Sequence, residues 1–153
     1  PNVTPGYWRK PRETEAVFVD GWFRTGDLGK KDEHGYYYIT DRLKHIIISG
    51  GENISPKEIE SLINQHPKVS ESCVVGIHDE RWGEKVVAAV VIKPGVMLAT
   101  KEIQDHCKQH LLDWKCPKEV FFLGELPRNK MGKILKEEVI KYFHILSLPH
   151  KEG

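Results

Sequence analysis

Two short segments place charged side chains where they could bind a phosphorylated ligand. In Thr25-Gly26-Asp27 a carboxylate follows a glycine, and such a carboxylate can accept hydrogen bonds from both hydroxyls of a ribose. In Asp41-Arg42-Leu43-Lys44 the planar guanidinium of Arg42 could bind a ribose or a phosphate. Taken alone, each segment fits a structural role better, the first as a turn aspartate that caps its own backbone and the second as a surface ion-pair cluster.

Two further segments combine glycine with polar or basic residues. Gly50-Gly51 within Ser49–Asn53 allows the backbone to turn sharply or to lie close to a ligand, and both interpretations stay open. The segment Pro127–Lys133 predicts a flexible basic loop, on which Lys133 is a mobile positive charge able to reach an anionic oxygen. It is not a Walker A loop, because Pro127 stands where that motif needs glycine and Ile134 where it needs serine or threonine. A solvated basic turn is the alternative.

No pattern indicates a metal site or a nucleophilic hydrolase. His106, Cys107, His110 and Cys116 lie close in sequence, but Cys107 falls on the apolar face of its predicted helix. No second Cys or His forms a tight ligand pair with Cys116, so no metal site is predicted. The motifs G-x-S-x-G, H-E-x-x-H and C-x-x-C do not occur in the sequence.

Composition limits the class of protein. The chain has 153 residues, of which 39% are hydrophobic and 29% charged, as is typical of a globular protein. Its net charge of +1 argues against nucleic-acid binding, and no apolar run is long enough for a membrane span. Three scattered cysteines and a polar, proline-rich N-terminus without a signal peptide favour a reducing, cytoplasmic location. Because the sequence starts at Pro1, we expect a piece of a longer protein.

The elements that must position these residues fall into two parts, with a boundary after Arg42. Residues 1–24 do not predict a compact unit, whereas 25–30 and 36–40 predict two strands joined by a loop at 32–35. Two strands alone are marginal in water, so this hairpin is expected to belong to a larger body.

The second part predicts a small α+β domain with about three core strands and three helices. Ser55, Pro56 and Glu58 predict a capped helix start, and Thr100 is expected to cap a second helix. Valine-rich runs predict buried strands. The predicted strands are 69–77, 86–92 and 120–123, the last helix covers 135–143, and 147–153 is a tail.

In their order and spacing these segments resemble the C-terminal part of acyl-CoA synthetases, in the adenylate-forming superfamily that includes firefly luciferase and peptide-synthetase adenylation domains. The resemblance covers about residues 6–143. It rests on Gly6-Tyr7-Trp8, Asp20–Asp27, Gly35-Tyr36, Asp41–Lys44, Gly50–Ile54, Glu58-Ile59-Glu60, Trp114–Pro117 and Leu126–Lys133.

The resemblance implies an organisation and a reaction. Residues 1–43 would end a large N-terminal adenylation domain, and 44–146 would form a C-terminal lid domain. In such enzymes a carboxylic acid attacks the α-phosphate of ATP to give an acyl-adenylate, and a thiol then displaces AMP. ATP, Mg²⁺ held mainly by the missing domain, and coenzyme A are the implied cofactors and co-substrates. The phosphate loop and acyl pocket would lie in the N-terminal domain, so the isolated chain is expected to be inactive.

The resemblance also implies roles for single residues. Asp27 matches the aspartate that holds the ATP ribose, and Arg42 an arginine that meets the nucleotide. Lys44 matches the hinge residue. Gly51, with its neighbour Gly50, matches the glycine beside the coenzyme A pantetheine tunnel. Lys133 matches the catalytic lysine of adenylation.

Other readings stay open. The acceptor could be a carrier protein, as in peptide-synthetase adenylation domains, although the end of this chain after its last helix favours a stand-alone ligase. A non-catalytic α+β interaction module is the third possibility, against which the balanced charge argues. Residues 128–133 are reminiscent of malonyl-CoA synthetases, but malonate, fatty acids and aryl acids all remain candidate substrates.

Overall fold

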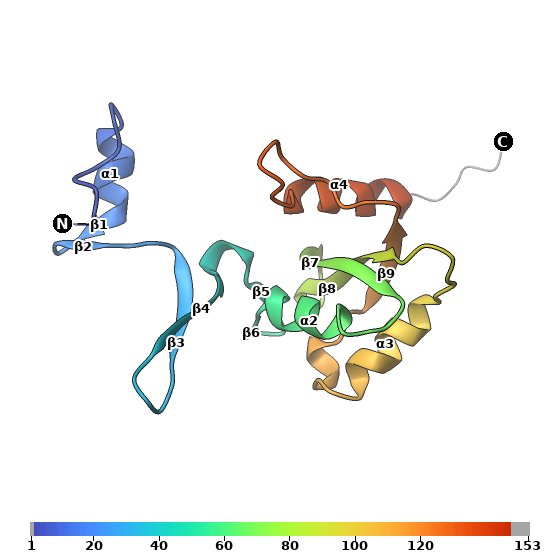
Figure 1. Cartoon of the computed structure of the whole chain (residues 1–153). Coiled ribbons are helices and arrows are strands. Elements are labelled where there is room, and N and C mark those ends of the chain that lie inside the picture. The colour runs from blue at the N-terminus through green and yellow to red at the C-terminus, as the bar shows by residue number, and fades with distance from the viewer. Residues whose placement is uncertain (1, 148–153) are drawn as a thin grey trace. The chain divides into compact units, whose positions relative to one another are not determined.

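The computed structural model describes residues 2–147, and the chain divides into two compact units, Pro1–Lys44 and His45–Gly153. Figure 1 labels their elements. The first unit contains α1 (Pro11–Val17), β1 (Phe18–Val19), β2 (Trp22–Phe23), β3 (Asp27–Lys31) and β4 (Tyr37–Arg42). The strands form two antiparallel pairs, β1–β2 and β3–β4. The predicted hairpin is therefore confirmed.

Helix α1 was not predicted, because residues 1–24 were expected to form no compact unit. Pro11 instead occupies the first turn of the helix, where its fixed φ is favourable and its missing N–H is not needed. The next turn follows the sequence more directly. Asp20 and Gly21 both have positive φ, 51° and 80°, as the tight turn between β1 and β2 requires.

The second unit is an α+β domain with five strands, not three. The 3₁₀ turn η1 (Leu43–His45) leads into it. Its elements are β5 (Ile47–Ser49), β6 (Glu52–Ile54), α2 (Pro56–Ile63), β7 (Val69–Asp79), β8 (Gly83–Ile92), α3 (Thr100–Lys108), the 3₁₀ turn η2 (Asp113–Lys115), β9 (Glu119–Leu123) and α4 (Lys136–Leu146). The strand order is β6-β5-β8-β7, and β9 pairs with β8 in parallel. The unpredicted strands β5 and β6 have three residues each, too few to show an alternating pattern.

Both faces of the sheet are covered, which explains the near-continuous valine runs. In the described part of the chain, α2 and α3 pack on one face and α4 on the other (Figure 1). Side chains alternate along β7 and β8 between the two resulting core clusters. The first cluster includes Val74, Val86, Ala88, Ile59 and Ile103, and the second includes Cys73, Val75, Val87, Val139 and Phe143.

Two predicted helix starts differ in detail. Ser55 and Pro56 begin α2 as expected, but the Glu58 carboxylate forms an ion pair with Lys115 at 2.8 Å. Ala99, not Thr100, is the N-cap of α3, and its N–H donates to Glu102 Oε1 at 3.0 Å. Among residues 2–147, no helix has the length and apolarity needed to cross a membrane.

Candidate functional site

Asp27 and Arg42 are direct neighbours across the β3–β4 ladder. They are register partners, and Asp27 Oδ1 lies 2.7 Å from Arg42 Nε. The Asp27 backbone N–H donates to Thr25 Oγ1 at 3.1 Å, which fixes the turn before the strand. Because one carboxylate oxygen pairs with the guanidinium, the other can accept from a ligand hydroxyl.

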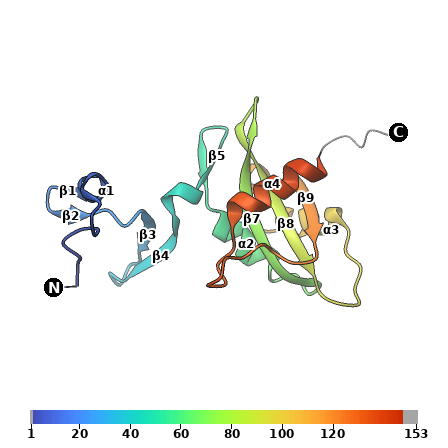
Figure 2. The same ribbon diagram turned by 90° about the horizontal axis from the view of Figure 1, so that it is seen from above.

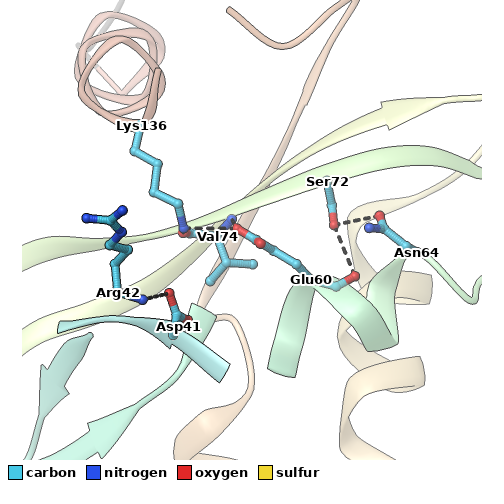
Figure 3. A network of polar contacts seen from close by, with 7 residues as sticks. All are labelled: Asp41, Arg42, Glu60, Asn64, Ser72, Val74 and Lys136. Atoms are coloured by element: carbon cyan, nitrogen blue, oxygen red, sulfur yellow. Dashed lines mark hydrogen bonds and ion pairs between the residues drawn. The ribbon is translucent and has the colours of Figure 1, made fainter. Parts of the chain in front are cut away.

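The backbone around Arg42 is held from both sides. Its own N–H donates to Asp41 Oδ1 at 2.7 Å (Figure 3), and the following residue, Leu43, donates its N–H to Gly26 O at 2.8 Å. Asp41 is buried, so this support is shielded from water. Lys44 follows within η1, at the division between the two units, and its side chain is exposed.

Gly50 and Gly51 form the two-residue turn of the β5–β6 hairpin. Both have positive φ, 60° and 85°, and Ser49 pairs with Glu52 across the turn. The surroundings of the two glycines differ. A Cβ at Gly50 would lie 3.1 Å from the Trp82 ring, whereas one at Gly51 would meet nothing within 4 Å. Gly51 therefore faces open space in this unit.

Trp82 is a neighbour of this turn that motif analysis missed. Its carbonyl accepts from the Gly50 N–H at 2.8 Å, and the residue is 43% exposed. The Arg81 guanidinium carbon lies 4.9 Å from the ring centroid, and Asp79 Oδ1 accepts from both Arg81 and Trp82 N–H groups at 3.0 Å. The sequence did contain a signal for this residue. A tryptophan in the short turn between two buried strands is unusual, because core burial does not account for a large aromatic side chain there.

Lys133 lies on a tightly bonded turn between β9 and α4, not on the flexible loop that was predicted. Asn129 Oδ1 accepts from the N–H groups of Met131 and Lys133 at 3.0 and 2.9 Å. The Asn129 N–H donates to Lys133 O at 2.9 Å, and Gly132 N–H donates to Asn129 O at 2.9 Å. The Lys133 side chain is exposed and forms no ion pair with any residue that the structure describes.

Both sides of this turn are attached to the rest of the unit. Arg128 pairs with Glu71 of β7 and also donates from Nη1 to Gly132 O at 2.7 Å. On the other side, the Lys136 ammonium at the start of α4 lies 3.0 Å from Glu60 Oε1 and 2.9 Å from Val74 O.

Glu60 continues this network into α2 (Figure 3). Its Oε1 also accepts from Val74 N–H at 2.9 Å. Ser72 Oγ donates to Asn64 Oδ1 at 2.8 Å and lies 3.4 Å from Glu60 O. The network therefore joins α2, β7 and α4, so the helix that follows Lys133 is fixed to the sheet.

The second unit also contains a histidine cluster and three cysteines. The imidazole of His106 lies between those of His66 and His110. Its ring centroid is 5.2 Å from that of His66 and 5.4 Å from that of His110. Within residues 2–147, no group of three or more His, Cys, Asp or Glu side chains could hold a metal ion. All three cysteines are free and buried, and burial raises the pKa of Cys73 and of Cys107 to about 12.

Comparisons with known proteins agree on one family. Residues 58–133 match the model of the AMP-binding enzyme C-terminal domain. The chain is 50% identical over 130 residues to a long-chain-fatty-acid–CoA ligase of Mycobacterium tuberculosis, covering 85% of this chain and 26% of that protein. It is 48% identical over 139 residues to an indoleacetate–CoA ligase of Aromatoleum aromaticum, covering 91% of this chain and 27% of the relative.

A solved structure shows the same fold. ATP-bound MatB from Rhodopseudomonas palustris matches with a TM-score of 0.88 and 42% identity, over 95% of this chain and 29% of that one. The chain thus spans about a quarter of the length of the curated relatives it matches.

Proposed function

The chain belongs to the family of AMP-binding enzyme C-terminal domains, and on that premise we propose that it is the C-terminal part of an ATP-dependent carboxylic acid–CoA ligase. The ligase would first form an acyl-adenylate and then transfer the acyl group to the thiol of coenzyme A. The names of the two relatives support this proposal, since long-chain fatty acids and indoleacetate are both carboxylic acids and both enzymes are named as their CoA ligases.

Lys133 carries the proposal for the first step. Adenylation brings a carboxylate against a phosphate, and a preorganised cation stabilises the negative charge that gathers in the transition state. Lys133 is an exposed cation on an ordered turn, and no carboxylate within the described part of the chain pairs with it. It is therefore free to meet the α-phosphate and the substrate carboxylate.

Asp27 and Arg42 would hold the nucleotide. The free oxygen of Asp27 can accept from the ribose hydroxyls, while its other oxygen is paired with Arg42 at 2.7 Å. Among the residues that the structure describes, the guanidinium pairs only through Nε, which leaves its two Nη groups for the nucleotide. This ion pair keeps both side chains in place before ATP arrives, which lowers the entropy lost on binding.

Gly50, Gly51 and Trp82 would form the wall for coenzyme A in the second step. Open space at Gly51 suits a pantetheine arm that passes close to the backbone. The β5–β6 hairpin and the segment 127–135 lie apart in both views of the second unit (Figures 1 and 2). One reorientation about Lys44, within η1, would exchange the two turns at a common active site.

The remaining partners follow from the same proposal. ATP, a carboxylic acid and coenzyme A are the small-molecule partners, a large N-terminal domain completes the active site, and the cytoplasm supplies all three substrates. Mg²⁺, the other implied cofactor, would be held mainly by the large N-terminal domain.

A chimeric ligase tests the proposal. In it, the matching residues of this chain replace the C-terminal segment of the Mycobacterium tuberculosis ligase. We expect fatty-acid-dependent ATP–pyrophosphate exchange and acyl-CoA formation, with the isolated chain inactive in both assays. A folded chimera that exchanges no pyrophosphate contradicts the proposal. Exchange without acyl-CoA formation, but with acyl transfer to a phosphopantetheinylated carrier protein, would make the carrier the acceptor.

A further inference from the structure

We propose that Asn129 and the Arg128–Glu71 ion pair are positioning residues for Lys133, which they hold in the geometry needed for adenylation. The inference rests on the role of Lys133 in the proposed function. It adds three side chains that would not touch the substrate and would act only through the backbone of the lysine.

Asn129 fixes the backbone of Lys133 at both of its polar groups. Its side-chain Oδ1 accepts from the Lys133 N–H at 2.9 Å, and its own N–H donates to the Lys133 carbonyl at 2.9 Å. The same Oδ1 accepts from Met131 N–H, so one amide oxygen organises both residues that flank Gly132. Asparagine suits this position because its short side chain mimics a backbone turn.

Arg128 attaches the turn to the sheet. Its guanidinium bridges the Gly132 carbonyl, at 2.7 Å, and the carboxylate of Glu71 on β7. The two side chains are 42% and 30% exposed, so the ion pair is partly shielded from water. An isolated bridge between Arg128 and Ile134 closes the base of the turn. The Cα of Lys133 therefore has a fixed position relative to the core.

Fixing the backbone matters because the lysine side chain is long and free. The flexible four-carbon chain already lets the ammonium occupy many positions, and a mobile backbone at the turn would increase their number. A displacement of about 1 Å in a catalytic group can cost about 100-fold in rate. By contrast, the neighbouring Lys130 makes no hydrogen bond or ion pair through its side chain in the described part of the chain, so it serves as a matched control.

The turn is tested first in the chain itself, by amide hydrogen exchange. We expect Asn129→Ala to raise the exchange rates of the Met131 and Lys133 N–H groups at least tenfold. Asn129→Asp, which keeps the acceptor oxygen, and Lys130→Ala should leave them within about twofold. Equal exchange rates in all four proteins would overturn the assignment of Asn129, whatever the protein does.

The catalytic consequence is tested in the chimeric ligase by measuring the two half-reactions separately. At saturating ATP and acid, Asn129→Ala and Arg128→Glu should slow adenylation at least tenfold. Thioester formation from supplied acyl-adenylate should stay within about twofold, because Lys133 has no part in it. Combining Arg128→Glu with Glu71→Arg should give faster adenylation than Arg128→Glu alone.

Lys133→Ala in the same assay distinguishes the proposed role of Lys133 from that of its positioning residues. If it leaves adenylation intact, the proposed function fails. If it slows adenylation while Asn129→Ala and Arg128→Glu do not, the positioning inference fails alone. Equal losses in both half-reactions for the latter two variants would show a purely structural role and overturn the inference.

Discussion

Asp27 and Arg42 hold each other across the β3–β4 ladder, with Asp27 Oδ1 2.7 Å from Arg42 Nε. The pair joins two residues fifteen positions apart that sequence motifs identified separately. Because a single register brings both side chains to one place, neither can be replaced without changing the orientation of the other.

Asp27→Asn should raise the KM for ATP by about 10- to 100-fold, since a hydrogen bond to a charged group contributes about 1.5–3 kcal/mol. The amide keeps the size of the side chain but loses the ion pair and one acceptor for the ribose. ATP–pyrophosphate exchange in the chimeric ligase measures the effect. Glu33→Gln, in the loop of the same hairpin, is the control and should leave the KM unchanged.

Gly51→Trp should slow thioester formation and leave adenylation nearly unchanged. A Cβ at Gly51 meets nothing within 4 Å, so a side chain can leave the backbone here without a clash, and the bulk of an indole is expected to obstruct the incoming thiol. The positive φ of 85° makes any side chain strained here. Gly51→Ala shares that strain without the bulk and is the control; equal defects in the two variants would contradict the tunnel role.

Lys136→Met should lower the free energy of unfolding by about 2 kcal/mol, because Glu60 and the Val74 carbonyl would both lose a partly buried partner. Urea denaturation of the chain measures the loss. Lys141→Met removes the exposed Lys141–Glu138 pair on the same helix and should cost less than about 0.5 kcal/mol. A similar loss in both variants would mean that the network adds no stability.

His66 should make the unit less stable in mild acid. Burial, together with the nearby His106 and Lys68, lowers the pKa of His66, and Glu102 opposes this only in part. Well above pH 6.5 the imidazole is neutral in both the folded and the unfolded state. Below that pH the unfolded state binds the proton more readily, so the free energy of unfolding falls as pH decreases. His66→Asn should flatten this dependence between pH 7 and 5, as followed by urea denaturation.

Sequence patterns predicted the elements whose signal is long or chemically distinctive. The α+β class, the hairpin around Asp32–Gly35 and the buried strands β7 and β8 were confirmed, because runs of β-branched residues have few alternatives. The β5–β6 hairpin was missed because three-residue strands carry no period, and α1 because Pro11 can either start or stop a helix. The roles of Asp27, Arg42, Lys44, Gly50, Gly51 and Lys133 stay predictions.

Two features of the candidate site depend on contacts between distant parts of the sequence. Trp82 lies beside Gly50 only because β5 pairs with β8 at Ser49 and Gly83. The Lys133 turn is ordered in part by Glu71, which is 57 residues from Arg128. A basic, glycine-containing segment predicts flexibility when only its composition is considered, and no local pattern could indicate the distant carboxylate that restrains it.

The hydrogen bonds that Glu60 and Lys136 make to the Val74 backbone also affect the exposed edge of the sheet. Strand β7 ends the strand order β6-β5-β8-β7, and its outer edge could offer free N–H and C=O groups to a strand from another molecule. At Val74 both groups are already occupied, one by a carboxylate and one by an ammonium. These contacts therefore occupy the middle of an eleven-residue edge, at a point where a strand from another molecule would need free backbone groups.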